Sequence, residues 1–258
     1  MTIDSHCHLD QADYTEPVEQ VMKRAQKAGV NRILAVACNP DDFQELAEQL
    51  KKYPFLYGAF GIHPEYAGKN QDIENIEKYI LSTGAIAVGE CGLDYHESIA
   101  THDQQKKLFC DQIDLAHKLH LPLMIHARDA EGDMRTILKQ AHQGGKLKDG
   151  FVLHCFSGSL DMAKEVVKMG GYLSASGVIT FKNAERVREI FSQIPLEHLL
   201  VETDAPYLAP HPLRGKQNEP AYVQYTLAKL AEIKGISEKE MEKITTENFE
   251  RLYTKGGK

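Results

Sequence analysis

TIDSHCHLDQADYTEPVEQVMKRAQKAGVNRILAVAC, residues 2–38, holds two short apolar segments on either side of a longer polar stretch. The segments 2–9 and 31–38 are rich in residues that favour β-strands. The stretch between them has apolar residues at helical spacing, namely Val18, Val21, Met22 and Ala25. Gly29 follows where a helix C-terminus is expected. This order predicts a strand, a helix and a second, parallel strand.

The same alternation continues along the chain and predicts eight strands, at residues 2–9, 31–38, 56–63, 85–94, 121–128, 151–158, 171–179 and 198–207. Residues 221–234 and 237–253 predict two closing helices, and 208–219 predicts a loop over the mouth of the barrel. Eight such units in about 250 residues favour an α/β fold of the (β/α)8 TIM-barrel type. A doubly wound sheet has fewer strands and a phosphate-binding glycine loop, which this sequence lacks. With no linker-like segment, we expect one domain over 1–258.

Composition is that of an ordinary folded protein, with 42% hydrophobic and 26% charged residues. No apolar run approaches the roughly 18 to 20 residues that a membrane span needs, and the N-terminus does not resemble a signal peptide. The five cysteines are odd in number and form no CxxC pair, which argues against a disulfide framework. We therefore expect a cytoplasmic protein without a membrane partner.

The net charge of −7 argues against a protein that coats nucleic acid through a broad basic surface. A local phosphate-binding site is still compatible with this charge. No obligate protein partner is indicated by the sequence.

Ionisable side chains lie within the apolar strands, near their C-terminal ends, where TIM barrels carry their active sites. His6 and His8 are two residues apart, so strand alternation points both to one face and turns Cys7 away. Glu202 and Asp204 have the same spacing on the eighth predicted strand. Buried groups of these types must be paired, bound to metal or functional.

Three further strands contribute to the same end of the barrel. His126 and Arg128 again are two apart, His154 ends the sixth predicted strand, and Glu90 lies near the end of the fourth. A lone histidine such as His154 is more often a hydrogen-bonded core residue than a ligand. The convergence of groups from five strands favours a metal site over that alternative. Four histidines and at least two carboxylates exceed the three or four protein ligands of one catalytic zinc.

The surplus of ligands predicts two divalent cations, and Glu90 is the candidate bridging carboxylate by its position. His63 ends the third predicted strand before Pro64, so it faces the mouth without a second ligand nearby, and we expect a substrate contact there. The remaining histidines lack a partner at metal-ligand spacing: His96, His102, His117, His120, His142, His198 and His211. We expect the cysteines beside the ligands to be small core residues.

Five segments, in order, resemble the TatD family of metal-dependent hydrolases, within the amidohydrolase-like barrels: IDSHCHLD (3–10), GECGLD (89–94), 122–128, HCFSG (154–158) and ETDAP (202–206). The resemblance implies that six residues bind the pair of divalent cations: His6, His8, Glu90, His126, His154 and Asp204. It also implies magnesium-dependent deoxyribonuclease activity, often at a DNA 3′ end. Many related barrels use a carboxylated lysine as the bridge, and the resemblance implies that Glu90 takes its place here.

Our hypothesis is phosphodiester hydrolysis by a metal-activated water. In it Asp204 is both ligand and proton acceptor, and Glu202 orients a ligand or aids proton transfer. Arg128 and His63 would hold the phosphate, because the planar guanidinium can donate two hydrogen bonds to phosphate oxygens.

Two alternatives stay open. The same metal centre could activate water against a carboxylic ester, amide or lactone, and the acidic net charge favours a small substrate. The protein could also be a non-catalytic metallo-scaffold, although spare carboxylates and an arginine at the mouth are unlike a closed structural site. Histidine and carboxylate ligands accept Zn, Mg, Mn or Ni, so the sequence does not identify the metal.

Overall fold

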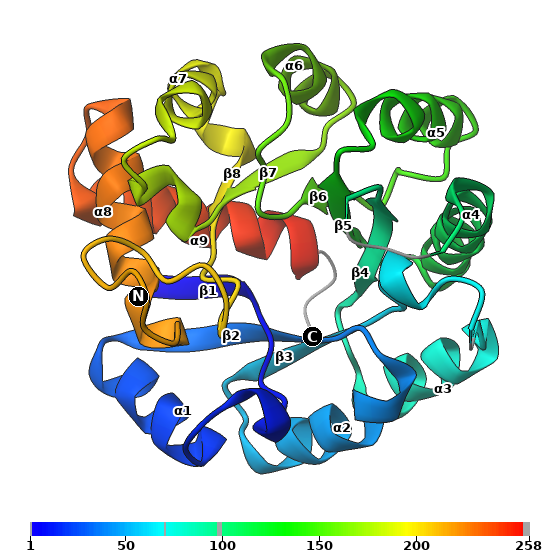
Figure 1. Ribbon diagram of the computed structural model, residues 1–258, viewed down its shortest axis with the longest axis horizontal. Helices are drawn as coiled ribbons and strands as arrows, with labels where there is room; N and C mark the ends of the chain where they lie inside the picture. Colours follow the sequence, from blue (N-terminus) through cyan, green and yellow to red (C-terminus); the bar gives the residue numbers. More distant parts are fainter. Residues whose placement is uncertain (1, 70, 97–99, 255–258) are drawn as a thin grey trace.

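The computed structural model describes residues 2–69, 71–96 and 100–254. Eight parallel strands pair in chain order into one sheet that curls into a barrel, with helices around its outside (Figure 1). This confirms the predicted (β/α)8 TIM barrel. Met1 and residues 255–258, the ends of the expected domain, lie outside the described residues.

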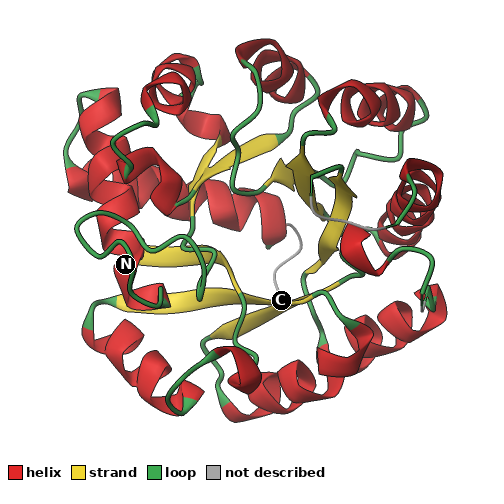
Figure 2. Cartoon of the chain, in the orientation of Figure 1, coloured by secondary structure: helices red, strands yellow, loops and turns green. Residues whose placement is uncertain are grey.

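The elements alternate along the chain (Figure 2). The strands are β1 (Thr2–Cys7), β2 (Val30–Ala37), β3 (Leu56–Phe60), β4 (Ala87–Asp94), β5 (Leu123–Arg128), β6 (Phe151–Leu153), β7 (Tyr172–Ala175) and β8 (Leu199–Val201). The α-helices are α1 (Val18–Lys27), α2 (Phe43–Lys52), α3 (Ile73–Thr83), α4 (His102–Leu119), α5 (Glu131–Gln143), α6 (Leu160–Lys168), α7 (Glu185–Gln193), α8 (Val223–Lys234) and α9 (Glu238–Tyr253). Short 3-10 helices are η1 (Gln11–Asp13), η2 (Pro40–Asp42), η3 (Pro64–Tyr66), η4 (Gly177–Thr180), η5 (Leu196–His198) and η6 (Pro220–Tyr222). None of these helices is both long and apolar enough to cross a membrane.

The late strands are shorter than predicted. β6 ends at Leu153 rather than at 158, and β8 ends at Val201 rather than at 207. His154 therefore lies one residue beyond its strand, and the prediction that Glu202 and Asp204 belong to β8 is wrong. Left-handed backbone at Cys155 (φ 44°) and Asp204 (φ 59°) breaks the extended conformation that periodicity alone predicts.

The core has two layers. Strand residues of alternating register fill the barrel interior: Ile3, Leu34, Val36, Ala59, Ala87, Met124, Val152, Tyr172 and Leu200. The neighbouring positions pack outward against the helices. Phe249 and Leu252 of α9 join the interior cluster, and α9 crosses the barrel behind the strands in Figure 1. α9 thus closes one end of the barrel, and the ends where the strands lead into their helices are left for the site.

The seam between β1 and β8 is closed by side chains as well as by backbone hydrogen bonds. Ser5 Oγ donates to Val201 O at 2.9 Å, and Asp4 accepts from the Thr203 amide at 2.9 Å and from its hydroxyl at 2.5 Å. Cys7 forms an isolated parallel bridge with Ala205. Burial raises the pKa of Asp4 to about 8. The barrel is therefore joined by hydrogen bonds at the end where the predicted site residues lie.

Replacing Phe249 by Ala is expected to lower the free energy of unfolding by about 3 to 5 kcal/mol, because it leaves a cavity beneath the barrel interior. Phe249 is 0% exposed, whereas Leu81 on α3 is 68% exposed and provides the control Leu81→Ala. Urea denaturation of both variants measures the difference. A loss as small for Phe249→Ala as for Leu81→Ala would contradict the role of α9 as the plug.

Candidate metal centre

The predicted ligands meet at the C-terminal ends of the strands. His6 is near the end of β1, Glu90 is in β4 and His126 is in β5. His154 directly follows β6, and Asp204 lies three residues after the end of β8. These five and His8, which directly follows β1, lie inside the barrel mouth, and His6 is 0%, His8 8% and Glu90 3% exposed.

Two β-bulges aim the buried ligands inward. In β1, the step from Asp4 to Cys7 stands opposite the shorter step from Ile33 to Ala35. β4 has the same extra residue, since Val88 to Cys91 pairs with Leu123 to Ile125. Ile3 and Ala87 already point into the barrel, so strict alternation would turn the residue three positions later outward. The extra residue in each strand instead returns that side chain to the interior.

One group of donor atoms gathers around His6 and His8. Their Nε2 atoms are 3.2 Å apart. Glu90 Oε2 lies 3.4 Å from the first and 3.5 Å from the second, and Asp204 Oδ1 lies 3.6 Å and 3.8 Å from them. Two imidazoles and two carboxylate oxygens thus face one point.

A second group gathers on the other oxygen of Glu90. Glu90 Oε1 lies 2.9 Å from His154 Nε2 and 3.1 Å from His126 Nδ1. These two ring nitrogens are 3.3 Å apart. His63 Nε2 approaches the same oxygen at 3.5 Å. The carboxylate of Glu90 therefore stands between the two groups, with one oxygen in each.

These spacings fit divalent cations. Two ligands bound at about 2.1 Å with a tetrahedral angle lie about 3.4 Å apart, and the donor atoms of both groups lie close to that separation. Imidazole and carboxylate are donors that such cations accept. The buried Oε2 of Glu202 has no hydrogen-bond partner among the described residues, so the centre also has unused donor capacity.

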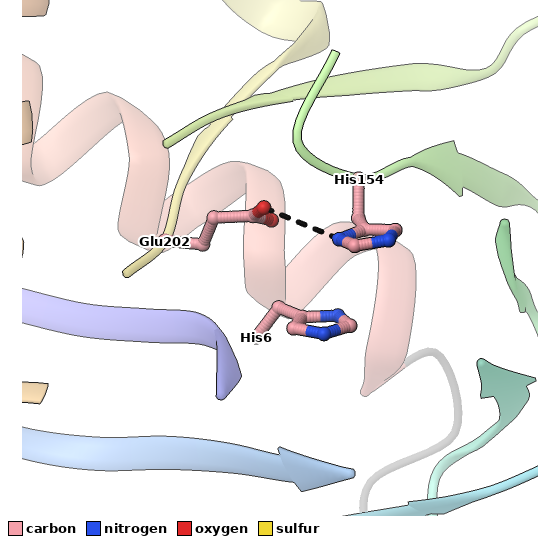
Figure 3. Close-up of side chains that lie close together, drawn as sticks. All are labelled: His6, His154 and Glu202. Carbon is pink, nitrogen blue, oxygen red and sulfur yellow. Dashed lines mark hydrogen bonds and ion pairs between the residues drawn. The ribbon is translucent and has the colours of Figure 1, made fainter. Parts of the chain in front are cut away.

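Carboxylates behind the histidines fix which ring nitrogen faces the centre. His154 Nδ1 lies 3.3 Å from Glu202 Oε1, and His126 Nε2 lies 2.9 Å from Asp94 Oδ2. When one ring nitrogen donates its N–H to the carboxylate, the lone pair of the other ring nitrogen points toward the metal centre. Figure 3 shows Glu202 directed at His154, with the His6 ring parallel to that of His154 at 4.0 Å between centroids.

Burial and charge pairing set the protonation of the centre. Burial lowers the pKa of His6 to about 4, so its imidazole is neutral and able to coordinate. Burial acts against the charge of Glu90, but His154 and His126 hold the pKa of this carboxyl well below its usual value. Glu90 and Glu202 outweigh burial at His154 and raise its pKa. A cation that binds must therefore displace protons from this cluster.

The comparisons with known proteins agree with this geometry. The family model "TatD related DNase" matches residues 3–254. The chain is 42% identical over 255 residues to the uncharacterized metal-dependent hydrolase YabD of Bacillus subtilis, strain 168. The match covers 98% of this chain and 99% of that one. It is 37% identical over 255 residues to YcfH of Escherichia coli K12, which has the same description, covering 97% and 95%. The chain belongs to the TatD-related DNase family. It is a metal-dependent hydrolase of that family, as the sequence motifs predicted.

A solved TatD relative has the same architecture. The crystal structure of YjjV, a TatD homologue from Escherichia coli K12, superposes with a TM-score of 0.89 at 30% identity and covers 98% of both chains. The TIM barrel of this TatD-family chain is thus shared along its whole length.

The prediction that His63 has no second ligand nearby is wrong. The sequence placed no second ligand near it, yet its Nε2 is 3.5 Å from Glu90, and its ring centroid is 4.6 Å from that of His126. The error arose because the pattern of the third predicted strand does not show where Glu90, in the fourth strand, lies relative to it. His63 Nδ1 accepts the Glu65 amide at 3.3 Å, so in the neutral ring the proton is on Nε2. In this tautomer Nε2 donates a hydrogen bond, although the donor atoms of His63, Glu90 and His126 also lie close enough together to hold a cation.

The other predicted residues take different places. Arg128 ends β5, is exposed, and lines a cavity beside His154 rather than the metal centre itself. Cys7 and Cys91 pack in the outer core layer, as expected. The candidate cation sites among the described residues contain none of the seven histidines that the sequence set aside. Asp94 is the residue that sequence reasoning missed: its position four residues after Glu90 was visible, but its contact with His126 was not.

Asp94→Asn is expected to weaken divalent-cation binding by about 10- to 100-fold, because the amide no longer fixes the His126 tautomer. Asn can still accept the His96 amide, which Asp94 Oδ1 accepts at 2.8 Å. Titration calorimetry of metal-free protein with Zn²⁺ or Mn²⁺ gives the affinity, and Asp133→Asn on α5 is the matched control. Equal affinities for the two variants would rule out this orienting role.

Proposed function

We propose that this hydrolase is a divalent-metal-dependent phosphodiesterase that acts as a deoxyribonuclease, with two cations held at the Glu90 centre. The observation that carries the proposal is the placement of Glu90, whose two oxygens face two separate groups of donors. One group would consist of His6, His8, Glu90 and Asp204, and the other of Glu90, His126 and His154. A bridged pair of cations is the arrangement that enzymes use for in-line displacement at phosphorus.

When bound, such cations supply Lewis acidity, neutralise phosphate charge and lower the pKa of a coordinated water. The protein's own residues move the proton and fix the geometry. Burial raises the pKa of Asp204 to about 7, so its carboxylate can take up the proton that the attacking water loses near neutral pH. Glu202 is 0% exposed and also accepts the Cys155 amide at 2.7 Å, which holds it rigidly behind His154.

Arg128 and His63 would hold the phosphate from two sides of the centre. Arg128 lines a cavity that also reaches His154, and its guanidinium suits phosphate oxygens. His63 can donate from Nε2 beside the second donor group. The substrate class that fits these donors is a phosphodiester, with DNA as the partner that the family description favours. Cleavage from the 3′ end is the mode we propose.

We also propose a cytoplasmic location and a single domain over the whole chain. Cys7, Cys38, Cys91, Cys110 and Cys155 are all free thiols in the structure, and free thiols suit a reducing compartment. Cell fractionation with an antibody against the protein tests the location. Metal analysis of freshly purified protein tests whether Zn, Mg, Mn or Ni is present and whether it amounts to two ions per chain.

Asp204→Ala is expected to reduce the kcat for single-stranded DNA by at least about 10² to 10⁴-fold while the barrel stays folded, since it removes the proton acceptor and one cation ligand. Activity is measured before and after EDTA treatment and metal return, with circular dichroism and metal content on the same samples. A variant with near-normal metal-dependent turnover would contradict the assignment. Carboxylic esters, amides and lactones belong in the same assay, and preferential turnover of these would favour the alternative hydrolase.

Arg128→Ala is expected to raise the KM for phosphodiester substrates by about tenfold, because one charge-assisted bidentate contact is lost. The control is Arg32→Ala, which removes a guanidinium from β2, where Arg32 pairs with Glu250 of α9 at 2.8 Å. KM and kcat are measured with single-stranded DNA and with bis-p-nitrophenyl phosphate. Unchanged values for Arg128→Ala would show that Arg128 does not contact the phosphate.

A further inference from the structure

A cavity of about 470 Å³ opens beside the metal centre, between the segments that follow β5 and β6. His154 forms part of its wall, so the cavity begins at the second donor group. It extends outward to Arg186, in the first turn of α7, and α5, α6 and α7 lie one after another around this part of the barrel (Figure 1). Its volume lies within the range of small-molecule sites, about 300 to 1,000 Å³.

The charged residues of this cavity are not equivalent. Asp129 is paired with His96 Nδ1 at 2.8 Å. Glu131 accepts from the amide and the hydroxyl of Ser159. Arg186, in contrast, has an exposed side chain that forms no hydrogen bond or ion pair with any residue in the described ranges. The acids are therefore already engaged. Of the two arginines that line the cavity, Arg128 is assigned to the scissile phosphate, so Arg186 is the one left for a further phosphate.

Part of the cavity wall is apolar. Leu153, Phe156 and Met162 line it, and all three are at most 5% exposed. A guanidinium and buried apolar side chains in the same cavity match a nucleoside that carries a phosphate. The sugar and base can pack on the wall while the phosphate meets the cation.

We propose that this cavity is a second phosphate subsite, in which Arg186 binds the phosphate one nucleoside away from the scissile one. The inference rests on the proposed phosphodiesterase function and narrows its substrate. The enzyme would prefer an oligonucleotide end with at least two successive phosphates over an isolated diester. Arg186 is a substrate-binding residue in this account, and the metal centre forms without it.

The test compares dinucleotides that differ by one phosphate. Thymidylyl-thymidine has the scissile diester alone, and its 5′-phosphorylated and 3′-phosphorylated forms each add one neighbouring phosphate. Wild-type protein should show a lower KM for one of the two phosphorylated forms. Arg186→Ala should raise that KM by about tenfold, with little change in kcat or in hydrolysis of bis-p-nitrophenyl phosphate. The dependence of log KM on log salt concentration should fall by about 0.7.

Lys182→Ala is the matched control, because Lys182 is an exposed cation four residues earlier that does not line the cavity. Arg186→Lys keeps the charge but loses the planar fork, and it should restore part of the affinity. If the added phosphate gives no advantage to wild-type protein, or if Arg186→Ala and Lys182→Ala behave alike, the subsite does not exist.

Binding separates this inference from the proposed function. The same dinucleotides are used to displace a fluorescent single-stranded oligonucleotide from metal-free protein. If no diester is hydrolysed, the proposed function fails, yet the displacement constants still decide the subsite. Weaker displacement by the phosphorylated form with Arg186→Ala but not with Lys182→Ala supports it, and equal displacement overturns it.

Discussion

The carboxylate of Glu90, surrounded by imidazoles inside the barrel, is the interaction on which the rest of the centre depends. A buried carboxylate is costly unless charge or hydrogen bonds compensate for its lost hydration. His6 and His8 approach one oxygen, and His126 and His154 approach the other. The four imidazole rings in turn share this one carboxylate as a partner. Removal of that group would leave imidazoles 3.2 to 3.3 Å from one another without a common partner.

Closure of the barrel and assembly of the site are the same event in this structure. The Asp204 amide donates to His6 O at 3.0 Å, and the His8 amide donates to Ala205 O at 2.7 Å. These bonds join β1 to the chain after β8, and they come from residues that carry donor atoms. The Asn218 amide group then donates to Thr203 O and Tyr207 O, which ties the following loop to the seam. The backbone positions of three candidate ligands, His6, His8 and Asp204, are therefore set by the contacts that complete the fold.

The sequence predicted the barrel and most of its donor atoms because both depend on local patterns. Alternation of apolar strands with amphipathic helices repeats eight times. The spacing of His6 and His8 can be read directly from the tripeptide at residues 6–8. Alternation could not predict that Glu90 points into the barrel. That direction depends on the bulge in β4, which shows only in the pairing of β4 with β5. The contact of Asp94 with His126 and the approach of His63 to Glu90 arise between strands. No single-strand pattern contains them.

The distribution of charge near the centre is compatible with the polyanionic substrate that we propose. The net charge is −7, so a polynucleotide is repelled by much of the surface. Acidic groups near the cavity are satisfied locally, as Asp129 is by His96 and Glu131 is by Ser159. Arg128 and Arg186 beside the centre, together with the cations that the centre can hold, are positive groups that attract phosphate. The proposed cleavage at a chain end fits this net charge, because a chain end brings fewer phosphates close to the acidic protein than the middle of a long strand does.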